Sequence, residues 1–507
     1  MVLSNMKKLA VLAAAMGFLT AGEAMAADLT DVLDAADEVY LNSENGTEKV
    51  SDPFDISLTP KFVQRHEWAK LKRENVDERG IHHLYNELEY KRVINRLDLD
   101  LEVGIWHDLA FRMNMPIVIS DQRSYKFDTS ADDEKNKVSG LNSWFSTNHE
   151  ATKPDENGEM KHYVNPNPYN FFNLNDGETL NGNKRSGIGD ISFGLAWSPY
   201  NTERHFIPER PWERNTGRST ITLAFDYVAP TGKFTKIDNT SVGSGTNEVI
   251  FSVAGSHRFP FVDPYIRLQL GIPVGLESAY KDFGDNQKRR DPGTWGRVDL
   301  GIEFIPYESF NIDYQRLVKI DLRGYFKYNG EGRIYSELAD AFGQGDCYNG
   351  QMNNGTFVGD PKCSWVAAKW TNAGKDNIHG MSPASTNPYT GSIMEDGIFD
   401  YEGYATVGGA LNLTIQPIQY VAIIAGVAAD YTQNHIITFT NVGKDRGTAT
   451  PDGTQLVQNS NKDGVVTDTV FDERNPAFST AIDRAGQRIK RTESFNLEWF
   501  AGIRVMY

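Results

Sequence analysis

The segment RLDLDLEVGIWHDLAFRMNMPIVIS, residues 96–120, alternates apolar and polar side chains over a longer run than most strands of soluble proteins. From 97 to 105 the odd positions are apolar, whereas Asp98, Asp100 and Glu102 occupy the opposite face. After the tripeptide WHD, the apolar positions resume from Leu109 to Ile119. This pattern predicts two long strands joined by a tight turn, each with one apolar and one charged face.

The same alternation recurs farther along the chain, at 190–197, 221–227, 266–274, 297–304 and 318–326. A soluble β-sandwich would bury such apolar faces against a second sheet. A membrane barrel would bury them in lipid. The alternation alone is compatible with both architectures, so the connections between the strands have to distinguish them.

The connections alternate in length. Four of them are short, with the sequences WHD, FPFVD, PYES and QPIQ, whereas residues 129–186, 329–399 and 441–493 are long and polar. The alternation predicts about twelve strands. They lie near 53–66, 86–106, 108–128, 187–199, 218–233, 247–259, 263–278, 295–306, 310–328, 400–415, 418–440 and 494–507.

An even strand number, with short turns at one rim and long loops at the other, is typical of outer-membrane proteins. A closed barrel is also the only sheet that leaves no unpaired edge in lipid. We therefore predict an all-β fold, a transmembrane antiparallel up-and-down β-barrel with long extracellular loops. Trp106, Trp197, Trp295 and Tyr420 are expected to form aromatic girdles at the rims.

The N-terminus indicates export. Residues 1–26 read as a signal peptide, with Lys7 and Lys8 before an apolar stretch and an Ala-Met-Ala cleavage site; an uncleaved anchor is the alternative. No later run of about 18 apolar residues occurs. Residues 27–52 would form either a plug or a loose periplasmic extension before a barrel at 53–507. These features predict the outer membrane of a Gram-negative bacterium, with both termini in the periplasm.

The last strand, FNLEWFAGIRVMY, ends the chain on an aromatic residue. It resembles the C-terminal recognition signal of outer-membrane proteins at Gly502, Val505 and Tyr507. The resemblance implies the barrel assembly machinery as a partner. The alternative is the edge strand of a soluble domain.

The cysteine content and the net charge bear on disulfide formation and on the class of binding partner. Cys347 and Cys363 lie close together and predict one local disulfide, with two unpaired thiols as the alternative. A net charge of −17 argues against nucleic acid as a partner. The expected partners are outer-membrane lipid and lipopolysaccharide, together with a small-molecule solute. No cofactor and no metal are expected.

The charged face of the strands should point into the barrel and carries both signs. Its candidate lumen-lining residues are Asp98, Asp100, Glu102, Arg112, Asp190, Asp226, Arg267, Arg297, Asp299, Glu303, Asp313, Lys319, Asp321, Arg323, Glu498 and Arg504. In one interpretation they line a polar passage that selects solutes. In the other they pair with one another and fill the bore.

Residues 187–278 resemble a known family. Its motifs here are Gly187, Gly189 and Asp190 at a strand start, then Pro230-Thr231-Gly232, then Gly243 and Gly245. The segment is similar to the outer-membrane barrels described as transporters of the meta-pathway of phenol degradation, and LDLDLEVGIWHDLAFRMNMPIV is similar to the family's hairpin. The resemblance implies passive uptake of small, apolar or aromatic molecules. The long insertions at 129–186 and 329–399 depart from the family pattern.

These observations predict an outer-membrane channel or passive transporter for small, apolar or aromatic solutes, without enzymatic turnover. A second hypothesis is a structural or surface-interaction barrel, whose lumen is closed and whose loops bind a partner. An enzyme embedded in the barrel is a third. We find no convincing Ser/His/acid or Cys/His spacing in the sequence to support it.

Overall fold

The computed structural model describes the following residues of the chain: 56–76, 82–106, 108–128, 179–201, 219–236, 239–275, 280, 291–311, 314–336, 338, 340, 351–353, 356–358, 397–418, 420–440, 448–449, 455–456, 483, 485–486 and 488–506. The predicted signal peptide, the extension at 27–52, both cysteines, Asp313 and Tyr507 lie outside these residues. Among the described residues, no helix is long and apolar enough to cross a membrane.

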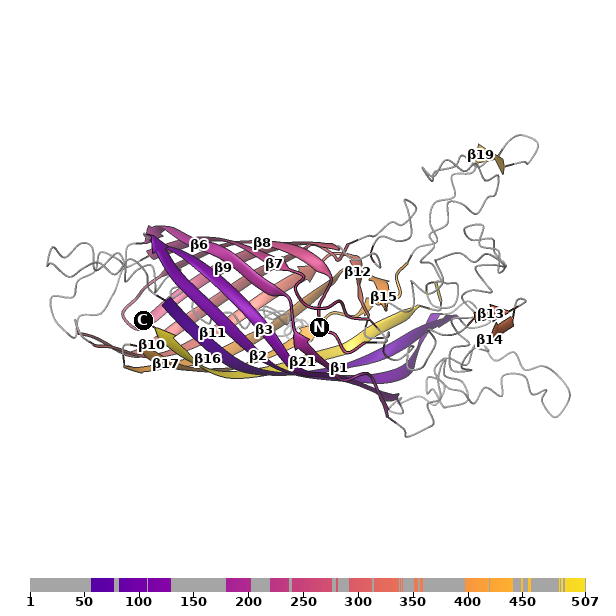
Figure 1. The fold of residues 1–507 in the computed structure, drawn as a ribbon, viewed down its shortest axis with the longest axis horizontal. Coiled ribbons are helices and arrows are strands. Elements are labelled where there is room, and N and C mark those ends of the chain that lie inside the picture. Colours follow the sequence, from indigo (N-terminus) through magenta and orange to yellow (C-terminus); the bar gives the residue numbers. More distant parts are fainter. Residues whose placement is uncertain are drawn as a thin grey trace, which may run out of the picture.

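Twelve strands of the described part form one antiparallel wall (Figure 1). In the order of their pairing they are β1 (Ile56–Val76), β2 (His82–Trp106), β3 (Leu109–Phe127), β6 (Ile191–Asn201), β7 (Ser219–Ala229), β8 (Thr246–His257), β9 (Val262–Gly275), β10 (Trp295–Asn311), β11 (Tyr314–Asn329), β16 (Tyr404–Ile418), β17 (Val421–Thr432) and β21 (Ile489–Met506). β21 also pairs with β1, from Ser57 opposite Met506 to Arg73 opposite Ile489. The wall is therefore a closed barrel, as the alternation predicted.

Short strands accompany the wall at its long-loop rim, which is the rim reached by the ends of β1, β7 and β11. β4 (Leu180–Asn181) and β5 (Arg185–Ile188) pair with β3, and β18 (His435–Ile436) pairs with β21. Separate two-stranded sheets are formed by β12 (Gly332–Tyr335) with β15 (Ile398–Tyr401), β13 (Gln351–Asn353) with β14 (Thr356–Val358), and β19 (Thr448–Ala449) with β20 (Gln455–Leu456).

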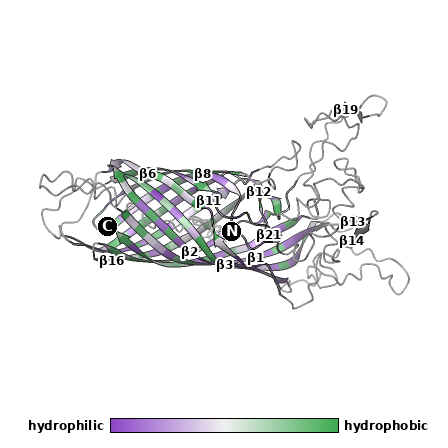
Figure 2. Ribbon diagram, in the orientation of Figure 1, coloured by the Kyte–Doolittle hydropathy of each residue, from purple (hydrophilic) through white to green (hydrophobic). Residues whose placement is uncertain are grey.

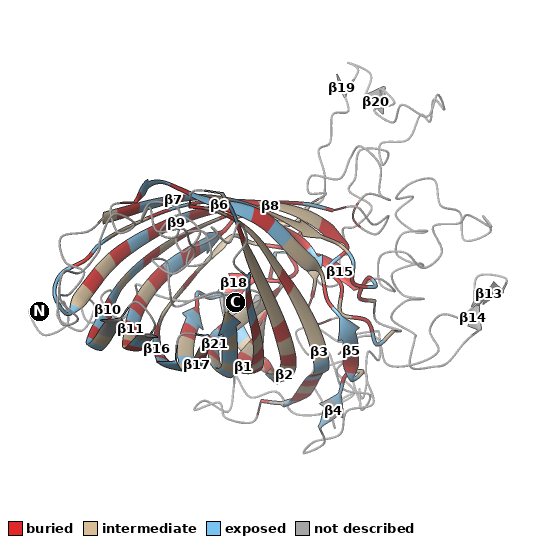
Figure 3. Cartoon of the chain, turned by 60° about the vertical axis from the view of Figure 1, so that its left-hand side comes forward, coloured by how far each residue is buried: buried red, intermediate tan, exposed pale blue. Residues whose placement is uncertain are grey.

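Hydropathy (Figure 2) and burial (Figure 3) both alternate along the strands with the predicted two-residue period. Leu268, Leu300 and Leu322 are exposed on the outside of the wall, while neighbouring Arg267, Asp299 and Asp321 are buried on the inside. This arrangement is the reverse of a soluble protein, whose apolar side chains are inside. It is stable where lipid covers the outer face, because each apolar side chain is then removed from water.

The prediction of Trp295 as a girdle residue was wrong. Its side chain is buried on the inner side, where Nε1 donates a hydrogen bond to Glu248 and the ring covers Gly271 on the neighbouring strand. Tyr265 lies over Gly301 in the same way. Trp197 and Tyr420 are exposed on the outside, as expected for girdle residues.

The wall is taller on one side. β1 has 21 residues, β2 has 25 and β3 has 19, whereas β6 and β7 have 11 each. The first predicted strand therefore ended too early, at 66 instead of Val76. Beyond Phe62 the described outward side chains of β1 are polar except for Trp68, so the apolar alternation that defines a strand in sequence disappears while the strand continues.

Other predicted boundaries also change. Predicted strand 187–199 spans the end of β5 and most of β6. Predicted strand 400–415 spans the end of β15 and most of β16, and predicted strand 418–440 contains β17 and β18. The last strand begins at Ile489 instead of 494. The chain breaks its pairing at these places to form the short strands at the long-loop rim, which the apolar alternation alone does not reveal.

A row of side-chain hydrogen bonds marks the edge of the apolar outer surface on the side of the long-loop rim. Gln64 donates to Asn95 at 2.7 Å, Asn95 donates to Ser120 at 2.8 Å, and the indole of Trp499 donates to Gln64 at 3.0 Å. The row crosses four neighbouring strands, β21, β1, β2 and β3. Since polar groups in hydrocarbon need partners, a row at the edge of the apolar surface fits the lipid boundary.

Candidate functional site

Charged side chains predicted to line the bore lie on the buried inner side of β9, β10 and β11. Asp299 is fully buried and accepts hydrogen bonds from Arg267 at 3.1 Å and from Arg297 at 2.7 Å. The ammonium group of Lys319 lies 3.8 Å from Glu303. These groups compensate one another's charge, which is how ionised groups are held in a confined space.

Asp321 is bound by neutral donors. It accepts hydrogen bonds from the hydroxyl of Tyr265 at 2.6 Å and from Asn412 at 2.8 Å. Arg323, two residues farther along β11, is also buried. This level of the barrel therefore contains a polar network drawn from β9, β11 and β16.

The first strands have their own set of pairs. Lys61 lies 2.6 Å from Asp100, and Arg96 lies 3.0 Å from Asp98. Arg112 of β3 reaches across β6 to form a two-point ion pair with Asp226 of β7. Bidentate pairs of this kind fix geometry as well as charge. The inner positions of Glu102, Glu498 and Arg504 are half-buried.

Gly502 of the C-terminal motif has a local structural reason to be glycine. A Cβ atom there would lie 2.7 Å from both Cγ of Lys61 and the carbonyl oxygen of Pro60. Gly502 thus permits β21 to approach β1 where the barrel closes. Val505, the second residue of the motif, is exposed on the outside of the wall. Recognition by an assembly machinery remains a prediction for these residues.

Asp190 binds backbone amides instead of a charged partner. Its two carboxylate oxygens accept hydrogen bonds from the amides of Gly232, at 3.0 Å, and Ser244, at 2.8 Å. Thr231 donates to the carbonyl of Gly189 at 3.1 Å. The loop after β7 and the start of β8 are thereby attached to the start of β6.

The glycines of this junction permit close backbone contact. A Cβ at Gly232 would lie 2.8 Å from Cα of Gly243, and a Cβ at Gly243 would lie 2.2 Å from the carbonyl oxygen of Gly232. The Gly-x-Gly-Asp, Pro-Thr-Gly and Gly-x-Gly motifs, although far apart in sequence, thus form one structural unit at the long-loop rim.

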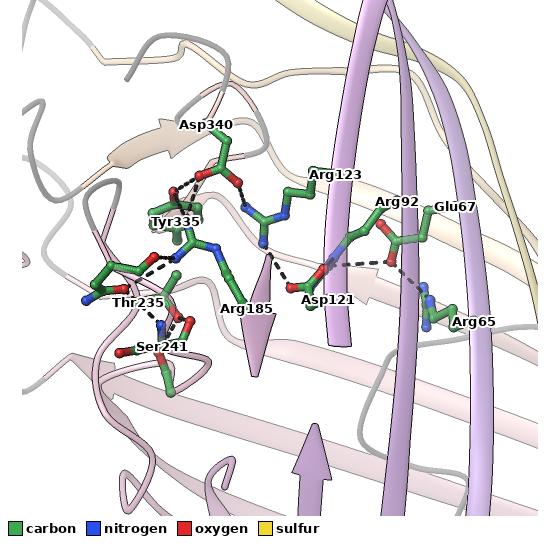
Figure 4. A network of polar contacts seen from close by, with 12 residues as sticks. Arg65, Glu67, Arg92, Asp121, Arg123, Arg185, Thr235, Ser241, Tyr335 and Asp340 are labelled. Atoms are coloured by element: carbon green, nitrogen blue, oxygen red, sulfur yellow. Dashed lines mark hydrogen bonds and ion pairs between the residues drawn. The ribbon is translucent and has the colours of Figure 1, made fainter. Parts of the chain in front are cut away.

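A chain of alternating charges crosses the inner wall at the level of this rim (Figure 4). Arg65 lies 3.9 Å from Asp430 and 3.0 Å from Glu67, which lies 3.7 Å from Arg92. Arg92 in turn donates to Asp121 at 2.7 and 2.8 Å. This part of the chain connects β17, β1, β2 and β3.

The chain continues into the loops (Figure 4). Arg123 lies 3.7 Å from Asp121 and donates to Asp340 at 3.1 Å. Arg185 of β5 donates to the other oxygen of Asp340 at 2.5 Å and to the hydroxyl of Tyr335 at 2.8 Å. Arg185 and Asp340 are both fully buried. We call this series of contacting residues the charge chain; in order, it consists of Asp430, Arg65, Glu67, Arg92, Asp121, Arg123, Asp340 and Arg185.

None of the residues in the charge chain was among the predicted site residues. Arg65, Glu67, Arg92, Asp121 and Arg123 belong to the tall part of the wall, where the outer face also becomes polar. The available signal was the continued spacing of two between charged residues, at 65 and 67 and at 121 and 123. Arg185 comes from the short strand β5 and Asp340 from the loop after β12, and sequence spacing gives no indication that they meet.

The β12–β15 sheet is held in place by buried polar contacts. Arg333 donates to Asp400 at 2.6 Å, with both side chains buried. The hydroxyl oxygen of Tyr401 accepts a hydrogen bond from the amide of Gly293 at 2.8 Å. Burial raises the pKa of Tyr401 to about 12, and burial together with Asp340 holds the pKa of Tyr335 well above its usual range. Both phenols therefore stay neutral.

A cavity of about 260 Å³ lies between this sheet and the tall wall. On the wall side it is lined by residues of the charge chain, including Arg65, Arg92 and Arg123. Its lining also contains aromatic residues, namely Tyr335 and Tyr401 of the β12–β15 sheet and Tyr404 of the wall strand β16. Among the described residues, no group of three or more His, Cys, Asp or Glu side chains is placed to hold a metal ion.

Part of the chain matches a known protein family. Residues 159–265 match a family model described as "Putative MetA-pathway of phenol degradation". The match contains all the glycine and aspartate motifs of the junction around Asp190, and it confirms the resemblance inferred from them. A comparison with curated protein sequences finds no match.

Solved barrels are similar to this chain at low sequence identity. An outer membrane channel from Pseudomonas putida F1 is 10% identical, with 88% of this chain and 95% of that chain covered and a TM-score of 0.34. The outer membrane protease OmpT from Escherichia coli is 7% identical, with 91% and 99% covered and a TM-score of 0.27. A Pseudomonas aeruginosa FadL homologue is 6% identical, with 97% and 99% covered and a TM-score of 0.28. These values assign no substrate to this chain.

Proposed function

We propose that this protein is an outer-membrane channel or passive transporter for small, apolar or aromatic solutes. The observation that carries the proposal is the two-sided wall, with apolar side chains exposed outside and charged side chains buried inside a closed barrel. The family match over residues 159–265 supports it. Solute passage through such a barrel needs binding and release only, so no catalytic step is included.

The proposal also covers the route to the membrane. The chain would be exported after cleavage behind Ala26 and inserted by the barrel assembly machinery. The short-turn rim and both termini would face the periplasm. Lipopolysaccharide would contact the outer surface between the row formed by Gln64, Asn95 and Ser120 and the long-loop rim. The signal peptide, the disulfide between Cys347 and Cys363 and the role of residues 27–52 are part of this proposal.

Conductance of the purified mature chain, residues 27–507, in planar lipid bilayers tests the function. Discrete current steps, together with swelling of proteoliposomes in small aromatic solutes, are the expected result. A correctly folded barrel that produces neither current steps nor solute uptake would contradict it.

A closed structural barrel is the second candidate, and one observation favours it. Asp299, Glu303 and Lys319 are paired and buried within the wall, as expected of a filled bore. Deletion of residues 343–395 discriminates between the candidates, since it leaves Asp340 and β15 in place. The structural role would be favoured if the deletion abolished partner binding and if neither the full-length chain nor the deletion variant showed solute flux.

A further inference from the structure

The cavity between the tall wall and the β12–β15 sheet has an excess of positive charge. Its lining contains Arg65, Arg92, Arg123 and Arg491, but only Glu67 and Asp430 as acidic residues. Asp121 and Asp340, which pair with Arg92 and Arg123, offset part of the excess. Asp340 is shared with Arg185, so one positive charge in the group remains without a carboxylate of its own. A positive lining is unexpected in a chain of net charge −17, and it favours a ligand with a single negative charge.

Two guanidinium nitrogens of the lining residues, Nε of Arg65 and Nε of Arg123, make no hydrogen bond. Arg123 is 7% exposed, and its Nη1 donates to Asp340 while its Nε makes no hydrogen bond. A buried guanidinium with incomplete hydrogen bonding is destabilising, so a negative charge in the cavity beside it would be favourable. A planar guanidinium is suited to a carboxylate, which offers two oxygens in one plane.

The lining of the cavity also contains several aromatic rings. Tyr404 stacks on His435 with 4.0 Å between ring centroids, and Tyr401 lies 5.8 Å from Tyr404. The ring of Tyr335 lies beneath the guanidinium of Arg123 at 5.0 Å. These rings provide flat apolar surface in the same cavity as the arginines, where the ring of a ligand can stack.

The volume limits the ligand to a small molecule. At about 260 Å³ the cavity lies below the range of roughly 300–1,000 Å³ that drug-sized ligands occupy. We infer that this cavity is a binding site for single-ring aromatic carboxylates, with the carboxylate at Arg123 and the ring against Tyr401 and Tyr404. The inference rests on the proposed transport function, for which it would be an entry site at the long-loop rim.

Calorimetric titration of the detergent-folded, full-length mature chain with benzoate tests the inference. Benzyl alcohol has the ring without the charge, and acetate has the carboxylate without the ring. We expect saturable binding of benzoate and at least about ten-fold weaker binding of the other two, because each lacks one of the two recognised groups. Equal binding of benzoate and either probe would overturn the inference, as would the absence of benzoate binding.

Variants locate the site. Arg123→Gln should weaken benzoate binding by about ten- to hundred-fold through loss of a charged hydrogen bond. Arg258→Gln is the matched control, because Arg258 is also a buried arginine paired at 2.5 Å, with Glu308 near the short-turn rim. Equal weakening by both variants would overturn the location.

Tyr404→Leu provides a second variant if Arg123→Gln does not fold. It removes an aromatic ring from the cavity and leaves the charge chain intact, so benzoate binding should weaken while acetate binding stays unchanged. Unchanged benzoate binding in a folded Tyr404→Leu variant would overturn the inference. Bilayer conductance of the same preparations reports on the proposed channel separately, since a conducting barrel that does not bind benzoate contradicts only the inferred site.

Discussion

Arg185 and Asp340 form a fully buried ion pair, with Nη2 of the arginine 2.5 Å from Oδ1 of the aspartate. The two residues are 155 positions apart in sequence and come from β5 and from the loop after β12. Asp340 also accepts hydrogen bonds from Arg123 and Tyr335. This carboxylate therefore holds the loop region against the barrel wall.

Asp340→Ala should destabilise the attachment of the loop region by about 3–5 kcal/mol, because it leaves two buried guanidinium groups without their acceptor. Limited proteolysis should show faster cleavage between β11 and β16. Glu89→Ala is the control, since Glu89 pairs with Lys126 on a more exposed surface and should change stability by less than about 1 kcal/mol. Similar protease resistance in Asp340→Ala and the wild type would contradict the assignment.

Gly243→Ala should disrupt the junction around Asp190, because the added methyl group would lie 2.2 Å from the carbonyl oxygen of Gly232. The expected loss of unfolding free energy is about 1–3 kcal/mol from overpacking. Urea unfolding followed by tryptophan fluorescence measures it. At Gly255 the closest atom is 3.5 Å away, so Gly255→Ala should be nearly neutral. An equal effect of the two substitutions would argue against close packing as the cause.

Leu322→Arg places a charge on the apolar outer surface, where Leu322 is 62% exposed. In a bilayer the barrel should lose about 2–4 kcal/mol if this position is near the midplane. Leu84→Arg is the control. Leu84 lies beyond the row of Gln64 and Asn95, so the same charge there should cost about 0–1 kcal/mol. Unfolding titrations in liposomes compare the variants, and equal losses would place the lipid boundary elsewhere.

Cysteines across the closing pair test the closure of the barrel. Phe62 lies opposite Ala501 in the pairing of β1 with β21. The double variant Phe62→Cys, Ala501→Cys should therefore form a disulfide upon mild oxidation of the folded protein. Phe62→Cys with Val505→Cys is offset by four residues, or about 13 Å along the strand, and should not. Electrophoretic mobility shows whether the disulfide forms in each double variant. Cross-linking of the offset pair would contradict the register of β1 with β21.

Sequence spacing was informative wherever one face of a strand contacts lipid. From Leu97 to Ile119 the apolar period of two gave the strands, their inner and outer faces and the barrel class, because lipid requires that every outward side chain be apolar. The motifs around Asp190 gave the family resemblance. The inner charges at Asp299, Lys319 and Asp321 were identified in the same way, as the opposite parity of lipid-facing residues.

Only the tertiary structure revealed the charge chain and the cavity beside it. Beyond Gln64 both faces of β1 mix polar and apolar side chains, with Trp68 outside and Leu71 inside, so the period of two no longer separates inside from outside. The pairing of Arg123 and Arg185 with Asp340, and the presence of Tyr401 in the same cavity as Arg65, depend on how loops fold over the rim. Such contacts have no sequence period, because a loop residue is placed by the whole of its surroundings and a strand residue is placed by the alternation of its own backbone.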